Sequence, residues 1–185
     1  MSEKVVIDAM RYWVDDVVIH HNFCPFARFV RHPETIHYQV CQATDVADIM
    51  LALHRACVQL DKNAEISTTL LMVPSLHRFD DYLDALSLAQ VMIAQWNYEG
   101  VYQLASFHPQ YEFEGEETAS PSHYTNRAPY PTFHLIREAD ITKAMEGYSD
   151  PDSIFEANIE RTEALGCSHL QAQLSACIKK AQGDT

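Results

Sequence analysis

The hydrophobic positions near the N-terminus recur with the period of a helix. One helical face carries Val6, Met10, Trp13, Val14 and Val17. This stripe predicts an amphipathic helix over residues 4–19. A second stripe predicts a helix that begins after Thr44 or Asp45, either of which is a favourable N-cap, and that ends near Leu60.

Short apolar runs with β-branched residues alternate with the helical segments. Strands are expected over residues 36–41, 67–73, 101–107 and 132–136. Further helices are expected over residues 80–96, 140–148, 152–165 and 167–181. The run at 67–73, STTLLMV, is β-branched or apolar almost throughout, which is typical of a strand covered on both faces.

This order of elements predicts an α/β protein, with α+β as the alternative class. We expect a single domain over residues 1–185, because a chain of 185 residues builds one full core and is short for two domains. The expected architecture is a four-stranded mixed sheet with a βαβαβ core, an N-terminal helix and a helical C-terminal part. The pattern leaves the direction of the fourth strand open.

About 25 residues without periodicity separate the third and fourth expected strands. A connection of that length inside a compact domain is usually either functional or disordered. The loop over residues 107–131 is rich in aromatic side chains, which argues against disorder. We therefore expect an ordered loop that contributes to a functional site.

Composition narrows the class of protein. The formal net charge of −13 argues against nucleic acid or an anionic membrane surface as the main partner. No apolar run approaches the roughly 20 residues of a membrane span, and the first ten residues do not resemble a secretory signal. Five cysteines without a CxxC pair indicate reduced thiols, so a cytoplasmic protein is expected.

Two histidines flank the long loop and are candidate catalytic residues. His108 follows the carboxyl end of the third strand, where ligand crevices of open α/β sheets lie. If the fourth strand is antiparallel to the third, His134 returns to the same edge. Histidine suits acid–base chemistry at neutral pH. The alternatives are a hydrogen-bonded His108 that pins the loop to the sheet and a half-buried surface histidine at position 134.

Cys24 is the third candidate catalytic residue. It precedes Pro25, which favours an extended backbone at position 24. Its thiol pKa, if lowered by Arg28, His20 or His21, would make it a nucleophile or a metal ligand. The alternative is a small buried hydrophobic residue in a turn.

The same region carries candidate ligand-binding residues. Arg127 and Arg137 offer planar guanidinium groups suited to a carboxylate or phosphate, and Tyr111 and Asn126 complete the set. The alternative for the arginines is an ion pair with a nearby glutamate that holds the loop closed, and Asn126 is also a favourable turn residue. No defined metal-binding loop is present in the sequence.

Three motifs in order, HNFCPFA, SFHPQYEF and NRAPYPTFHLIRE, resemble an uncharacterised bacterial family, domain of unknown function 1415. The resemblance extends from the first helix to about Leu165. It implies a single-domain, cytoplasmic protein whose motif residues include Cys24, His108, Asn126 and His134. It implies no reaction, because the family has none assigned.

Three functions are compatible with these features. The first is an enzyme or binder of a small anionic metabolite, with an Arg/His/Cys site at the strand-end crevice. The second is a metal or haem protein that uses Cys24 with histidines. The third is a protein-interaction module that uses the Tyr- and Pro-rich loop over residues 107–131. The sequence leaves the substrate, cofactor and oligomeric state open.

Overall fold

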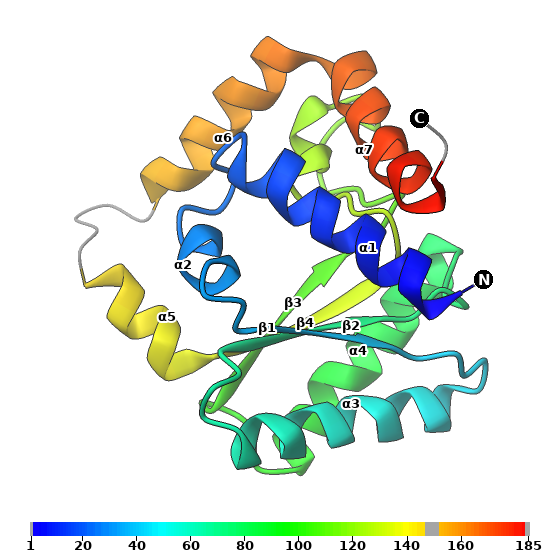
Figure 1. Ribbon diagram of the computed structural model, residues 1–185, viewed down its shortest axis with the longest axis vertical. Helices are drawn as coiled ribbons and strands as arrows, with labels where there is room; N and C mark the ends of the chain where they lie inside the picture. The colour runs from blue at the N-terminus through cyan, green and yellow to red at the C-terminus, as the bar shows by residue number, and fades with distance from the viewer. Residues whose placement is uncertain (1, 147–151, 184–185) are drawn as a thin grey trace.

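A four-stranded mixed sheet forms the centre of the protein, with helices on both faces (Figure 1). The computed structural model describes residues 2–146 and 152–183. The strands are β1 (Ile36–Val40), β2 (Thr68–Met72), β3 (Tyr102–Phe107) and β4 (Thr132–Arg137), in the spatial order β1-β2-β4-β3. β1 and β2 are parallel, and β4 is antiparallel to both of its neighbours, β2 and β3. The expected α/β fold is confirmed.

Helices α3 (Val46–Lys62) and α4 (Phe79–Gln95) cover one face of the sheet. All five residues of β2 are buried, as expected for a strand covered on both faces. Leu71 of β2 belongs to the core on the side of α3 and α4, together with Tyr82 of α4 and Phe133 of β4. Asp45 caps α3, since its Oδ1 accepts the Ala47 N–H at 2.9 Å.

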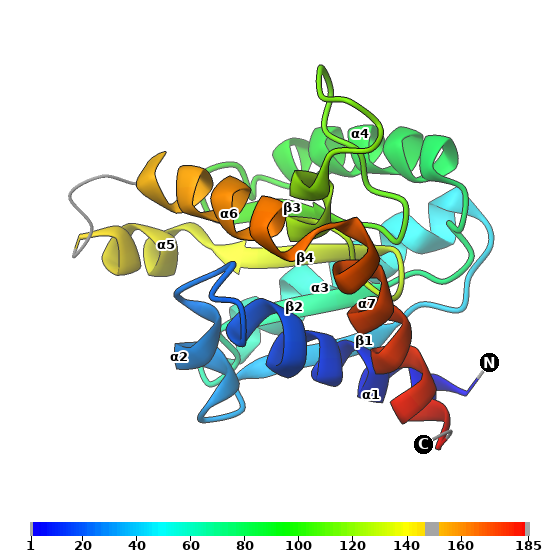
Figure 2. The same cartoon turned by 90° about the horizontal axis from the view of Figure 1, so that it is seen from above.

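The other face is covered by the two ends of the chain. Helix α1 (Glu3–Trp13) continues into the π-helical segment η1 (Val14–Ile19), so the single expected helix changes its winding at residue 14. Helix α7 (Cys167–Gln182) lies along α1 in both views (Figures 1 and 2). Trp13, Leu70 and Leu174 meet in the core on this side.

Two short elements were not expected from the sequence. Helix α2 (Ala27–Arg31) buries none of its residues, so no hydrophobic stripe announces it. The 3₁₀ turn η2 (Pro121–Thr125) lies inside the long loop and contacts α6 (Asp152–Leu165). Helix α5 (Glu138–Met145) begins two residues earlier than expected, and its expected end near position 148 lies outside the described residues.

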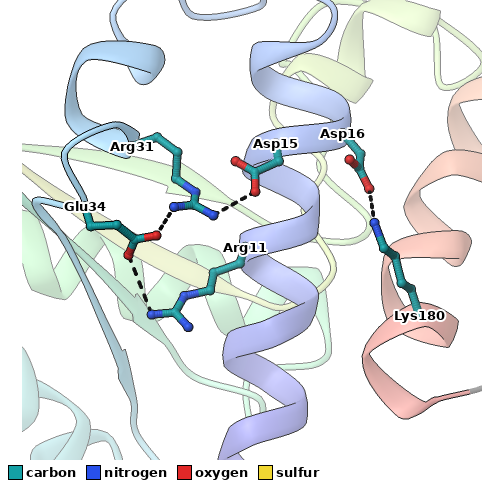
Figure 3. Close-up of polar contacts among 6 residues, drawn as sticks. All are labelled: Arg11, Asp15, Asp16, Arg31, Glu34 and Lys180. Atoms are coloured by element: carbon teal, nitrogen blue, oxygen red, sulfur yellow. Dashed lines mark hydrogen bonds and ion pairs between the residues drawn. The ribbon is translucent and has the colours of Figure 1, made fainter.

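Ion pairs link η1 to its neighbours (Figure 3). Asp15 pairs with Arg31 of α2 at 2.8 Å, and Arg31 also pairs with Glu34. Asp16 pairs with Lys180 of α7 at 3.0 Å. Exposed pairs contribute little free energy, so these contacts accompany the packing of α2 and α7 around η1 and add little to its stability. Within the described ranges, no helix is long and apolar enough to cross a membrane.

Candidate functional site

A cavity of about 380 Å³ opens beside Phe107, the last residue of β3. Its wall comes from the end of the N-terminal helix, the long loop and α6. Four aromatic side chains contribute to it: Phe23, Phe107, Phe113 and Phe155. The polar residues in the wall are Cys24, Ser122, Thr125, Asn126 and Asn158. The cavity is therefore largely apolar, and every polar group in its wall is uncharged or, for Cys24, a weak acid.

The turn at residues 22–24 is fixed to α6 by two hydrogen bonds. Asn158 donates its side-chain N–H to the Phe23 carbonyl at 2.8 Å, and Arg161 donates to the Asn22 carbonyl at 3.4 Å. Asn22 has a φ of 53°, a left-handed conformation that asparagine tolerates better than most residues. This turn brings Cys24 to the cavity, while Phe23 is buried beneath it.

The surroundings of Cys24 do not favour a thiolate. The residue as a whole is exposed, but protein atoms crowd its sulfur, and this desolvation raises the thiol pKa. The backbone N–H groups of Phe26 and Ala27 act in the opposite direction and offset only part of the effect. The direction of this pKa shift is opposite to the one that a nucleophilic Cys24 requires.

Cys24 also lines a second cavity, of about 390 Å³. Ile19, Asn22, Pro25, Arg28 and Phe29 line it together with Cys24. It differs from the first cavity in carrying a formal charge, the guanidinium of Arg28.

His108 pins the long loop to the segment before α4. The residue is completely buried. Its Nε2 donates to the Leu76 carbonyl at 3.0 Å, and its Nδ1 accepts the Gln110 N–H at 3.0 Å. Burial lowers its pKa, so the ring is neutral. With both nitrogens engaged away from the cavities, His108 has the geometry of the loop-pinning alternative.

His134 lies on the opposite face of the sheet from the His108 ring. His108 packs against Tyr82 of α4, whereas the His134 ring lies 5.9 Å from that of Phe107, on the α1 side. Nε2 of His134 donates to Oγ1 of Thr68 at 2.7 Å, because that hydroxyl donates in turn to a backbone carbonyl. Burial lowers the pKa of His134 to about 4. β4 is antiparallel as required, but the two histidines do not share a crevice.

Arg127 lies beside the first cavity without lining it. Its Nε donates to the Tyr111 carbonyl at 3.1 Å, and its guanidinium lies 4.5 Å above the centre of the Tyr124 ring. No carboxylate pairs with it among the described residues, so the alternative interpretation of Arg127, an ion pair with a loop glutamate, is not found there. The Tyr111 ring packs against Phe79 and Phe113, and Tyr111 is not among the residues that line either cavity.

Asn126 and Cys24 are the two sequence-predicted residues that line the same cavity. Asn126 also holds the loop in place, because its side chain donates to the Ser106 carbonyl at 3.1 Å and its own carbonyl accepts the His108 N–H at 3.1 Å. The side chain is thus a fixed part of the wall.

Arg137 lies at the opposite end of β4 from the cavities. Its Nη2 donates to the carbonyls of Leu60, Asn63 and Ile66, at 2.6, 3.1 and 3.1 Å. These groups lie at and just beyond the C-terminal end of α3, where helix carbonyls lack intrahelical partners. Arg137 therefore acts as a side-chain cap, and the structure separates it from the other candidate site residues.

The long loop is ordered, as expected. His123 is completely buried inside it, where Nδ1 accepts the Phe113 N–H at 3.1 Å and Nε2 donates to the Glu117 carbonyl at 2.9 Å. Ser122 donates to the Glu116 carboxylate. His123 and the cavity residues of α6 were not among the site residues predicted from the sequence. A lone histidine or a weakly amphipathic helix gives no sequence signal that separates a cavity wall from ordinary packing.

The described part of the chain holds no cluster of potential metal ligands. No group of three or more His, Cys, Asp or Glu residues lies close enough to hold a metal ion among residues 2–146 and 152–183. His108 and His134, the two expected partners of Cys24, lie on different sides of the sheet.

Fold and site together define a single-domain α/β protein with a largely apolar cavity between the long loop, the residue 22–24 turn and α6. The chain belongs to the family described as "Protein of unknown function (DUF1415)", whose profile matches residues 5–172. That range contains all three motifs, so the resemblance seen in the sequence is confirmed. No curated protein and no solved structure matches the chain significantly.

Proposed function

We propose that this protein binds a small molecule with an apolar body in the cavity beside Phe107. The observation that carries the proposal is the composition of the wall: four phenylalanines, with a few fixed polar groups at Cys24, Asn126 and Asn158. Small-molecule sites are typically concave and mainly apolar, with a small number of placed polar groups, and about 300–1,000 Å³ in volume. The cavity, at about 380 Å³, is within that range.

The hydrogen bonds of the wall also support binding. Asn126 and Asn158 are each held by a backbone carbonyl, so their remaining amide groups need not reorganise when a ligand arrives. Preorganised polar groups reduce the entropy cost of binding. The proposal is one of binding: His108 and His134 do not line the cavity, and desolvation raises the pKa of the Cys24 thiol.

The interaction-module alternative receives less support. Tyr124 and Tyr130, two of the aromatic residues that motivated it, are 6% and 7% exposed. A docking surface requires such side chains to be accessible to the partner. The loop instead directs these rings into the protein.

A ligand screen followed by NMR tests the proposal. Small aromatic and aliphatic compounds are added to ¹⁵N-labelled protein, and hits are expected to shift the amide signals of residues 23–24, 107 and 126. Phe155→Ala should weaken the best hit about fivefold or more, which corresponds to about 1 kcal/mol of lost contact. Phe155 is 55% exposed, so this substitution leaves the core intact.

Val91→Ala is the matched control, because Val91 is 53% exposed on α4 across the sheet. Its affinity for the same hit should equal that of the wild type. Equal effects of the two substitutions, or a broad library without a single hit at the cavity, would remove the proposal.

A further inference from the structure

We infer that the ligand carries an anionic head group, which the second cavity holds through Arg28 and Asn22. This inference rests on the proposed function and specifies the class of ligand: an apolar body with a carboxylate or phosphate at one end. The body occupies the first cavity, and the head group passes Cys24 into the second.

The two cavities are adjacent, because Cys24 lines both. The wall of the first contains no charged side chain, whereas the second contains Arg28. A molecule that extends from one to the other therefore meets apolar rings first and a cation last. This polarity matches an amphipathic anion.

Arg28 is available for an external anion. Helix α2 carries two arginines, and Arg31 is neutralised by Asp15 and Glu34 (Figure 3). Arg28 forms no ion pair with any carboxylate in the described part of the chain. Several other basic residues of the described ranges also lack an ion pair, so what singles out Arg28 is its place in the wall of the second cavity.

Asn22 adds a neutral donor to the same cavity. Its backbone carbonyl is held by Arg161, and its side chain has no hydrogen-bond partner among the described residues. An amide N–H beside a guanidinium can share the oxygens of a carboxylate or phosphate. The left-handed backbone at Asn22 places this side chain in the wall of the second cavity.

The other arginines near the loop are less suited to this role. Arg127 covers the Tyr124 ring and does not line either cavity. Arg137 is fully engaged with the end of α3. The sequence predicted Arg127 and Arg137 as the anion-binding cations. In this inference Arg28, which directly follows the motif HNFCPFA, takes that role.

Three probes that share one apolar body test the inference: 4-phenylbutyrate, 4-phenylbutyl phosphate and the neutral 4-phenylbutan-1-ol. Their dissociation constants are measured by ¹⁵N NMR titration of wild type, Arg28→Ala, Arg28→Lys and Arg55→Ala. Arg55 is an exposed arginine on α3, so its removal gives the same charge change on the far face.

The wild type should bind the better anionic probe about threefold to fivefold more tightly than the alcohol, as expected for a partly exposed ion pair. Arg28→Ala should abolish that preference, Arg28→Lys should keep part of it, and Arg55→Ala should keep all of it. Which anion binds more tightly identifies the head group as carboxylate or phosphate.

Equal binding of the alcohol and both anions to the wild type would overturn the inference while leaving the proposed function intact. The same holds if Arg28→Ala and Arg55→Ala reduce the anion preference equally, because the effect would then reflect net charge. Failure of all three probes to bind would count against the proposed function itself.

Discussion

Three histidines in this protein use their ring nitrogens to join separate parts of the chain. His108 and His123 each join two backbone groups through their ring nitrogens. His134 bonds Thr68 between two strands. Such a ring satisfies a donor and an acceptor at once, provided that it stays unprotonated.

Acid should therefore destabilise the protein through His134. Its folded pKa of about 4 lies below the value of about 6.5 for an unfolded chain. The unfolded chain binds more protons in that interval, so the stabilisation is complete above pH about 6.5 and is lost as the pH falls towards 4. The loss is on the order of 3 kcal/mol.

Urea unfolding of wild type and His134→Leu at pH 7 and pH 4.5 measures this contribution. The fall in the free energy of unfolding between the two pH values should be smaller in the variant by about 2–3 kcal/mol. His32→Leu, at an exposed position, should leave the fall unchanged. An identical fall in the wild type and in His134→Leu would contradict the contribution of His134 to the pH dependence of stability.

Cys24 should react slowly for an exposed cysteine. Because desolvation raises its pKa, the midpoint of its alkylation rate against pH should lie above the usual value of about 8.5. Mass spectrometry of iodoacetamide-treated protein should still find Cys24 modified ahead of the buried Cys41, Cys57 and Cys177. A midpoint below pH 8 would restore the activated-thiol hypothesis.

At the scale of single elements, side chains from distant parts of the chain complete the ends of helices and turns. Arg137 of β4 caps α3, and Asn158 of α6 fixes the turn before Cys24. These contacts join segments that are more than 70 residues apart in the sequence. An element of this fold therefore owes part of its stability to a partner that its own sequence does not contain.

Removal of the Arg137 cap should destabilise the protein. Arg137→Ala leaves the carbonyls of Leu60, Asn63 and Ile66 without their charged donor, at a cost of about 2–3 kcal/mol in the free energy of unfolding. Arg137→Lys should recover only part, because an ammonium lacks the planar fork. Denaturant unfolding measures these changes. Arg55→Ala is the control, and its free energy of unfolding should lie within about 0.5 kcal/mol of the wild-type value.

At the scale of the whole molecule, the sheet separates two hydrophobic cores. One lies between the sheet and α1 with α7, and the other lies between the sheet and α3 with α4. The candidate cavities are on the α1 side, where the loop and α6 complete the covering of the sheet.

Both cores should be essential for stability. Trp13→Ala on one side and Leu71→Ala on the other should each lower the free energy of unfolding by about 2–5 kcal/mol. These side chains are 2% and 0% exposed. Leu88 lies on α4 and is 38% exposed, so Leu88→Ala should lower the free energy of unfolding by clearly less than either core substitution. Denaturant midpoints that barely move in the first two variants would contradict the description of the cores.

Much of the fold was readable from local pattern. The stripe from Val6 to Val17 predicted the N-terminal helix, and the uniform burial of β2 followed from its apolar run. The site was less readable. Cys24 and Asn126 were predicted and do meet at one cavity, but His108, His134 and Arg137 were placed together only by their positions near strand ends. Strand ends specify an edge of the sheet and not the face on which a side chain lies.

The sequence by itself determined the four strands and the long helices, the α/β class, the order of the long loop and the family, because each depends on periodicity, composition or motif order. The short elements α2 and η2 have no such pattern. The tertiary structure alone decided which polar residues share a cavity. A hydrogen bond such as that from Asn158 to the Phe23 carbonyl spans 135 positions of the chain. Local pattern carries no information on such a pairing, because it is selected by the packing of α6 against the loop and the N-terminal turn.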